Sequence, residues 1–119
     1  MSLVVLMVEM EQPEGISARK LVIETAKHNV ITAYNGGDGL ALLRRFPKVD
    51  AVIVHEKIRD ISFEGMAREV RQIRPDVRIV ALSPSHHVPV NGADFVVSSH
   101  DPQGLLTLLA KEFQVPTNN

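Results

Sequence analysis

Short apolar runs rich in β-branched residues recur along this chain, and they constrain its fold more than any other feature. The clearest lie at residues 3–8, 51–54 and 77–82, the last interrupted only by Arg78. Strands that are apolar at nearly every position are typical of a parallel sheet covered on both faces by helices. Segments with a helical period separate these runs, most clearly at residues 63–73. The alternation therefore predicts an α/β fold.

The order of the segments predicts a five-stranded parallel sheet that is doubly wound and flavodoxin-like. Strands are expected at residues 3–8, 30–34, 51–54, 77–82 and 95–97. Helices are expected at 16–28, 40–46, 63–73 and 102–113, with a turn at 35–39. Between the fourth and fifth strands, Pro84, Pro89 and the lack of an apolar period predict that the connecting helix is short or missing.

The composition of the chain limits its function classes. Its 119 residues fit one domain, expected at residues 1–119 with a flexible tail at 115–119. The absence of cysteine excludes disulfides, thiol catalysis and cysteine-based zinc sites. The net charge of -1 predicts no direct binding to nucleic acid or to anionic membranes. No apolar run approaches the roughly 20 residues that span a bilayer, so we expect a cytoplasmic protein.

Five short motifs stand at characteristic places along the predicted strands and helices. They are the small-residue turn at 35–39, the strand at 50–54, Gly65 near a helix start, Ser83 after the fourth strand, and Gly92-Ala93-Asp94 before the fifth. In this order and spacing, the chain resembles the receiver domain of two-component response regulators over nearly its whole length. The resemblance implies the same fold and a role in signal transduction.

The resemblance also implies a phosphoacceptor pocket, and here the sequence departs from the family. In place of the family's phosphoacceptor aspartate stands His55, and the acid pair after the first strand is reduced to Glu9 followed by Met10. The family's lysine near the end of the fifth strand is replaced by Ser98 or Ser99, and we assign Ser99 to that position. These residues define a degenerate pocket, which we call the receiver pocket: Glu9, Met10, His55, Ser83 and Ser99.

The chemistry of these replacements argues against phosphorylation. Aspartyl phosphorylation needs a carboxylate nucleophile, which His55 is not. It also needs Mg²⁺, which prefers carboxylate oxygens, and a cation to pair with the phosphoryl group. Two aspartates near the third strand are poor substitutes, because Asp50 lies at its wrong end and Asp60 in the following loop. We therefore predict a pseudo-receiver with no catalytic residue, no bound metal and no cofactor.

Two hypotheses for function remain open at this point. The first is signalling by protein–protein contact, with a signalling protein or a fused effector domain as partner and a homodimer as an alternative. The second is a module that binds a small ligand or a divalent metal through Glu9, His55 and Ser83, with His86 or His87 as further ligands. An enzyme is not expected, because no base can be assigned to Ser83.

Overall fold

A computed structural model describes residues 2–10, 18–84 and 89–113. Three predicted features lie outside these residues. They are the tail at 115–119, the start of the first helix at 16–17, and the histidines at positions 86 and 87.

The five predicted strands form one parallel sheet. They are β1 (Val4–Val8), β2 (Asn29–Ala33), β3 (Ala51–His55), β4 (Arg78–Ser83) and β5 (Phe95–Ser98). The strand order is β2-β1-β3-β4-β5, and all four pairings are parallel. The predicted fold class is therefore confirmed. Each strand agrees with its predicted range to within one residue at either end.

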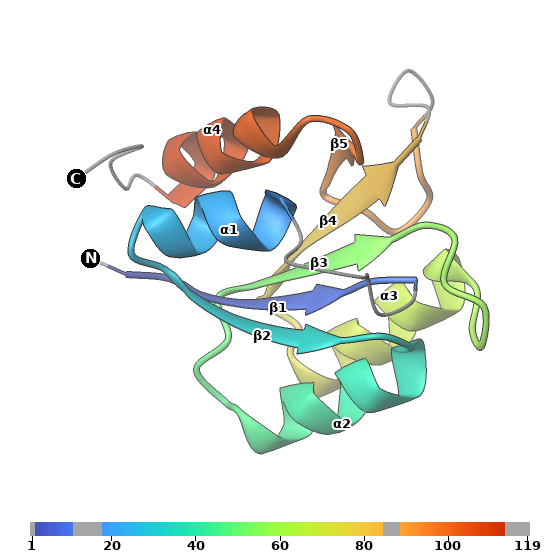
Figure 1. The fold of residues 1–119 in the computed structure, drawn as a ribbon. Helices are drawn as coiled ribbons and strands as arrows, with labels where there is room; N and C mark the ends of the chain where they lie inside the picture. The colour runs from blue at the N-terminus through green and yellow to red at the C-terminus, as the bar shows by residue number, and fades with distance from the viewer. Residues whose placement is uncertain (1, 11–17, 85–88, 114–119) are drawn as a thin grey trace.

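The helices cover both faces of the sheet. They are α1 (Ala18–Thr25), α2 (Gly36–Arg45), α3 (Phe63–Ile73) and α4 (Pro102–Phe113). Figure 1 shows α1 and α4 on one face of the sheet and α2 and α3 on the other. The described part of the β4–β5 connection contains no helix, as predicted. Within the described ranges, no helix has the length and apolarity needed to cross a membrane.

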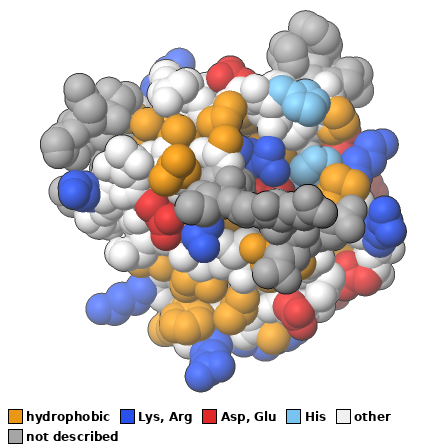
Figure 2. Space-filling model, viewed as in Figure 1, with side chains coloured by type: hydrophobic (Ala, Val, Ile, Leu, Met, Phe, Trp, Pro, Cys, Tyr) orange, Lys and Arg blue, Asp and Glu red, His pale blue; other side chains and the backbone are white. Residues whose placement is uncertain are grey.

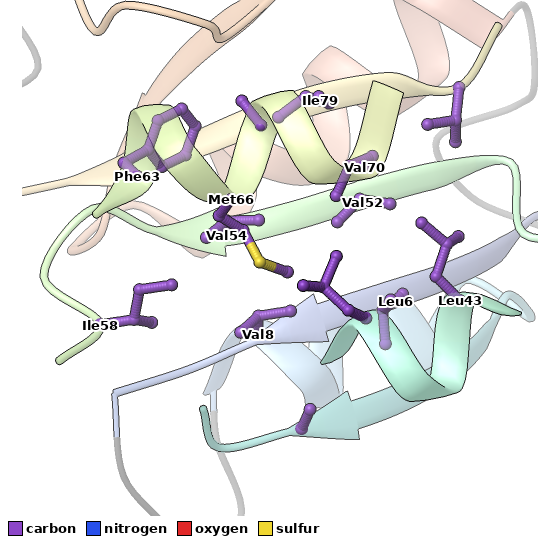
Figure 3. Close-up of a cluster of buried hydrophobic side chains, with 14 of the residues drawn as sticks. Leu6, Val8, Leu43, Val52, Val54, Ile58, Phe63, Met66, Val70 and Ile79 are labelled. Atoms are coloured by element: carbon purple, nitrogen blue, oxygen red, sulfur yellow. The ribbon is translucent and has the colours of Figure 1, made fainter. Parts of the chain in front are cut away.

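Each face of the sheet has its own apolar core, because successive residues of a strand point to opposite faces. On one face, Leu6 and Val8 pack with Met66 of α3 and Leu43 of α2 (Figure 3). On the other face, strand residues such as Met7 pack with residues of α1 and α4, which include Ile23, Leu105 and Leu109. The central strands β1 and β3 are therefore buried on both faces, which explains their continuous apolar sequences.

The prediction for α2 was wrong at its start. A turn was expected at 35–39 with a helix from residue 40, but α2 begins at Gly36 and includes three glycines. One amide side chain and one carboxylate stabilise the first turn of α2. The Asn35 side chain accepts a hydrogen bond from the Asp38 N–H at 2.7 Å. The Asp60 carboxylate accepts from the N–H groups of Gly36 and Gly37, at 2.8 and 2.9 Å. Capping thus overrides the low helix propensity of glycine.

The Asp60 carboxylate is held by these two backbone donors. The hydrogen bond from Gly36 is the largest influence and lowers the pKa of Asp60, with a further lowering from Gly37. The loop between β3 and α3 is therefore anchored on the positive end of the α2 dipole. Asp60 has a structural role that its position in a loop did not indicate.

Close packing explains one glycine of α2 and gives a test. A Cβ on Gly39 would lie 2.8 Å from Cγ2 of the buried Val8, whereas a Cβ on Gly37 would be 3.5 Å or more from its neighbours. A glycine-to-alanine change inside a helix normally stabilises by up to about 1 kcal/mol. We expect Gly39→Ala instead to lower the free energy of unfolding by about 1–3 kcal/mol, because it overpacks the core.

The matched control for this change is Gly37→Ala, which should leave the free energy of unfolding unchanged or raise it. Urea denaturation of the two variants and the wild type measures both effects. Equal stability of the two variants would show that the contact between α2 and β1 is looser than described.

Candidate functional site

The receiver pocket lies at the carboxyl ends of the strands. Val8 of β1 pairs with Val54 of β3, so the residues that follow them, Glu9 and His55, stand at neighbouring strand ends. Between these two strands the chain switches from one side of the sheet to the other. Ligand sites of open α/β sheets lie at such switch points. Ser83 ends β4, and the Ser99 N–H donates to the Ser83 carbonyl at 2.9 Å.

The structure thus brings four predicted residues to one end of the sheet: Glu9, His55, Ser83 and Ser99. All four are buried. Met10, the fifth predicted position, follows Glu9 in a bend and is half-buried. Two residues that were not assigned to the pocket, Arg19 and Glu56, contact this group.

The Glu9 carboxylate is paired with the guanidinium of Arg19 from α1. Arg19 Nη2 donates to Glu9 Oε1 at 2.6 Å, and Arg19 Nε donates to Oε2 at 3.0 Å. This two-point geometry is the strongest form of an arginine–carboxylate contact. The Glu9 side chain is only 8% exposed, so its carboxylate is shielded from water, whereas the Arg19 side chain is 21% exposed. Both oxygens of the first-strand carboxylate are therefore used within the protein.

Arg19 also reaches the end of β5. Its Nη1 donates to the carbonyl oxygen of Ser99 at 2.6 Å. One guanidinium thereby links α1, β1 and the segment that follows β5. Ser99, assigned to the family's lysine position, contributes a backbone oxygen here, while the cation beside the pocket comes from α1.

Arg19 was missed in the sequence because its position on a predicted helix gave no sign of which way its side chain points. The available signal was indirect. A carboxylate at the end of a buried strand needs a partner, and Arg19 and Lys20 are the basic residues nearest to Glu9 in the sequence. The sequence alone does not show whether the partner of Glu9 is Arg19, Lys20 or a basic residue that is distant in sequence and close in the folded chain.

A second carboxylate faces Ser83. The Ser83 hydroxyl donates to Glu56 Oε1 at 2.8 Å, and the Glu56 N–H donates to the Leu82 carbonyl at 2.9 Å. Glu56 therefore lies against the end of β4 although it follows β3. Ser83 is 1% exposed. A substrate has no access to its hydroxyl in this arrangement.

His55 is a neutral imidazole held at the end of β3. Its Nδ1 accepts a hydrogen bond from the Lys57 N–H at 3.1 Å, so the ring is oriented by the backbone of the following turn. Burial is the largest influence and lowers the pKa of His55. The nearby charge of Glu9 opposes this lowering, and that of Arg19 adds to it. The net result is a lowered pKa of His55.

The other acids near β3 lie where the sequence placed them. Asp50 accepts a hydrogen bond from the Val4 N–H at 2.8 Å, at the amino end of β1. Asp60 is bonded to the start of α2. Neither carboxylate belongs to the group around His55. In the described ranges, no group of three or more histidine, aspartate or glutamate side chains is arranged to hold a metal ion.

Comparisons with known proteins place this geometry in a broader context. No family model matches the chain, and no curated protein matches it. Solved structures do match. A CheY-like response regulator receiver domain from Methanospirillum hungatei JF-1 superposes with a TM-score of 0.80 and 17% identity, covering 96% of this chain and 95% of that one.

Two further structures have the same architecture. The signal receiver domain of an HD domain-containing protein from Pseudomonas fluorescens Pf-5 has a TM-score of 0.80 and 16% identity, covering 96% of both chains. A CheX–CheY–BeF3–Mg complex from Borrelia burgdorferi matches with a TM-score of 0.78 and 16% identity, covering 93% of this chain and 89% of that one. The fold is that of CheY-like receiver domains.

The pairing of Arg19 with Glu9 gives a stability test. In Arg19→Met, the Glu9 carboxylate stays buried without its partner, so we expect the free energy of unfolding to fall by about 2–4 kcal/mol. The exposed Arg68 on α3 provides the matched control, and Arg68→Met should change stability by no more than about 0.5 kcal/mol. Adding Glu9→Gln to Arg19→Met should recover part of the loss, because no charge then remains buried. Denaturant unfolding measures the free energy of unfolding of the wild type, the two single variants and the double variant.

The lowered pKa of His55 predicts acid sensitivity. The unfolded chain takes up a proton on this histidine near pH 6.5, before the folded protein does. Stability is therefore fully present above about pH 6.5 and is lost as the pH falls toward the folded pKa. We expect His55→Asn, which keeps an acceptor for the Lys57 N–H, to reduce the loss of stability between pH 7.5 and 5.5.

The exposed His100 gives a graded comparison, because its charge contributes to the lowering of the pKa of His55, and His100→Asn should reduce the loss less than His55→Asn does. Some acid sensitivity should remain in His55→Asn. His28 is also buried, and burial lowers its pKa in the same direction. The urea midpoint of each protein is measured at both pH values. The same change of midpoint in wild type and in His55→Asn would contradict the assignment of acid sensitivity to His55.

Proposed function

We propose that this chain is a pseudo-receiver: a cytoplasmic, receiver-like signalling domain, spanning residues 1–119, that contacts protein partners and takes up no phosphoryl group at residue 55. The proposal combines a receiver fold with a pocket whose chemistry differs from the one that phosphorylation requires. The single observation on which it depends most is the pair between Arg19 and Glu9.

The pair bears on metal binding directly. A receiver pocket that binds Mg²⁺ must offer carboxylate oxygens to it. Here both Glu9 oxygens accept hydrogen bonds from Arg19, and the guanidinium brings a fixed positive charge to the end of β1. A divalent cation would have to displace this charge from a buried partner. Met10 supplies no oxygen from its side chain, and His55 supplies a nitrogen.

The nucleophile is the second requirement for phosphoryl transfer. Residue 55 stands at the end of β3, where the family has its phosphoacceptor, and its side chain is an imidazole that accepts the Lys57 N–H through Nδ1. The nearest carboxylate in sequence, Glu56, accepts a hydrogen bond from Ser83. The polar groups of this pocket are thus engaged with one another, which supports a structural role for them.

Function then rests on contact with other proteins, and we propose a signalling protein or a fused effector domain as the partner. The Borrelia burgdorferi structure, in which CheY is in a complex with CheX, is an example of a receiver fold engaged by a protein. Direct binding to nucleic acid or membranes is not part of the proposal. Basic and acidic side chains are interspersed on the face seen in Figure 2, and the net charge is -1.

The decisive experiment is incubation with acetyl phosphate and Mg²⁺, followed by intact mass measurement. We expect no phosphoryl adduct on this protein, because residue 55 is not a carboxylate nucleophile and both oxygens of Glu9 are paired with Arg19. The Borrelia burgdorferi CheY, whose structure contains BeF3 and Mg, serves as the control treated in parallel. An adduct on this chain that hydroxylamine removes would refute the proposal.

The small-ligand or metal hypothesis is tested with the same sample. A thermal shift with divalent cations or nucleotides that disappears in His55→Ala would favour ligand binding, because a ligand that binds the folded state raises its apparent stability. The pseudo-receiver proposal expects no such shift.

A further inference from the structure

The dipeptide Asn-Gly occurs twice in this chain, at residues 35–36 and 91–92. In this sequence the backbone nitrogen of the glycine attacks the preceding side-chain amide with little hindrance, because glycine has no Cβ to block the approach. One copy stands at the start of α2 and the other in the β4–β5 connection. The two settings differ in the contacts that such an attack has to break.

Asn91 and Gly92 are the central residues of an exposed β-turn. The Ala93 N–H closes the turn by donating to the Val90 carbonyl oxygen at 3.1 Å, and Gly92 has a φ of 95°, as in a type II turn. Both central residues are exposed. Within residues 2–10, 18–84 and 89–113, neither the Gly92 N–H nor the Asn91 side chain has a hydrogen-bond partner. The attacking nitrogen and the amide under attack are therefore both free to move.

The same two groups are held in place at the start of α2. The Asn35 side chain accepts a hydrogen bond from the Asp38 N–H at 2.7 Å and donates to the Asp38 carboxylate at 3.0 Å. The N–H of the buried Gly36 donates to the Asp60 carboxylate at 2.8 Å. An attack of Gly36 on Asn35 therefore requires that the cap of α2 first opens.

We propose that Asn91 is a site of spontaneous modification, at which the side-chain amide becomes a carboxylate through a cyclic imide, and that the fold protects Asn35 from the same reaction. The surface turn thus reacts, and the helix cap with the identical dipeptide does not.

The reaction needs only water and hydroxide. The Gly92 nitrogen gives its proton to hydroxide and forms a bond to Cγ of Asn91. The bond between Cγ and Nδ2 breaks, and Nδ2 takes a proton from water and leaves as ammonia. Water then opens the five-membered imide at either of its carbonyl groups, which gives aspartate or isoaspartate. In total, one water is consumed and one ammonia is released for each asparagine converted.

The packing of the turn requires the reactive glycine. Its positive φ favours glycine over every other residue. A Cβ on Gly92 would also lie 2.8 Å from the Cβ of Ala67 on α3. A bulkier residue that would slow the attack is therefore excluded from position 92 by the structure, and reactivity depends on which residue precedes it.

The modification changes the charge of the surface beside α3. Arg71 Nη2 donates to the Gly92 carbonyl at 2.8 Å and lies 3.3 Å from the Asp94 carboxylate. A carboxylate at position 91 adds a negative charge next to the residue that Arg71 holds. The isoaspartate product also lengthens the backbone by a methylene group before Gly92, so we expect it to loosen the hydrogen bond from Arg71.

This inference is independent of the proposed absence of phosphorylation, because neither Asn91 nor Gly92 belongs to the receiver pocket. A phosphoryl adduct and an amide-to-acid change differ in mass, so each proposal fails on its own measurement.

Peptide mapping by mass spectrometry tests the inference after the folded full chain has been kept in mildly alkaline buffer. We expect the amide-to-acid mass change to appear at Asn91 at least about tenfold faster than at Asn35, whose hydrogen bonds must break first. The same chain in concentrated urea is the matched control. Without the fold, the two sites should react at rates within about threefold of each other. Equal rates in the folded chain, or a faster reaction at Asn35, would overturn the inference.

Two variants separate the sites further. Asp60→Ala removes the acceptor of the Gly36 N–H, so we expect the reaction at Asn35 to accelerate several-fold while Asn91 keeps its rate. Asn91→Gln should abolish the reaction at position 91, because its longer side chain does not close a five-membered ring, and should leave Asn35 unchanged. An unaltered rate at Asn35 in a folded Asp60→Ala protein would contradict the assigned protection. If Asp60→Ala does not fold, the comparison of folded and urea-unfolded wild type still decides.

Discussion

The pairing of Arg19 with Glu9 is the interaction on which the carboxyl end of this sheet depends. A carboxylate that ends a buried strand loses its hydration, and only a well-placed cation offsets that loss. Arg19 provides two hydrogen bonds to Glu9 and a third to the Ser99 carbonyl. The same guanidinium holds α1 over the sheet and joins its centre to the end of β5. One ion pair therefore sets both the position of a helix and the electrostatics of the pocket.

The neighbouring groups follow from this arrangement. Burial makes the neutral ring of His55 more stable than its charged form and so lowers its pKa, and the positive charge of Arg19 adds to this lowering. Glu56 lies one strand further along and is hydrogen-bonded to Ser83. The result is two separate polar contacts at the ends of β1 and β4 with an uncharged imidazole between them. In a phosphoacceptor site, the same positions would bring several carboxylates toward one point.

Much of the fold could be predicted because its signals are local and repeated. Short continuous apolar runs rich in β-branched residues are typical of strands buried on both faces. The apolar period of α3 predicted both ends of that helix correctly. The start of α2 could not be predicted in the same way. Its glycines have low helix propensity, and their stabilising contacts come from Asp60, 24 residues away in the sequence, and from close packing on Val8.

The site shows the same division between local and distant signals. Strand ends identified Glu9, His55 and Ser83, because topology alone brings carboxyl ends together. Their partners could not be identified, because Arg19 lies on a helix face and Glu56 in a turn whose path depends on the finished fold. The strand order predicted which strand-end residues lie near one another. It did not predict which charged side chains pair with them, because this depends on side-chain directions that no sequence pattern encodes.

The anchoring of Asp60 on the first turn of α2 has a mechanical consequence. The two backbone amides that could receive an external anion are already occupied by an internal counter-ion. The segment after β3 is consequently fastened at both its ends, to the strand and to a neighbouring helix. Any partner that pulls on this segment must also tilt α2, and through Gly39 it must disturb the tightly packed β1. A force on the loop is therefore transmitted to α2 and, through Gly39, to β1 at the centre of the sheet.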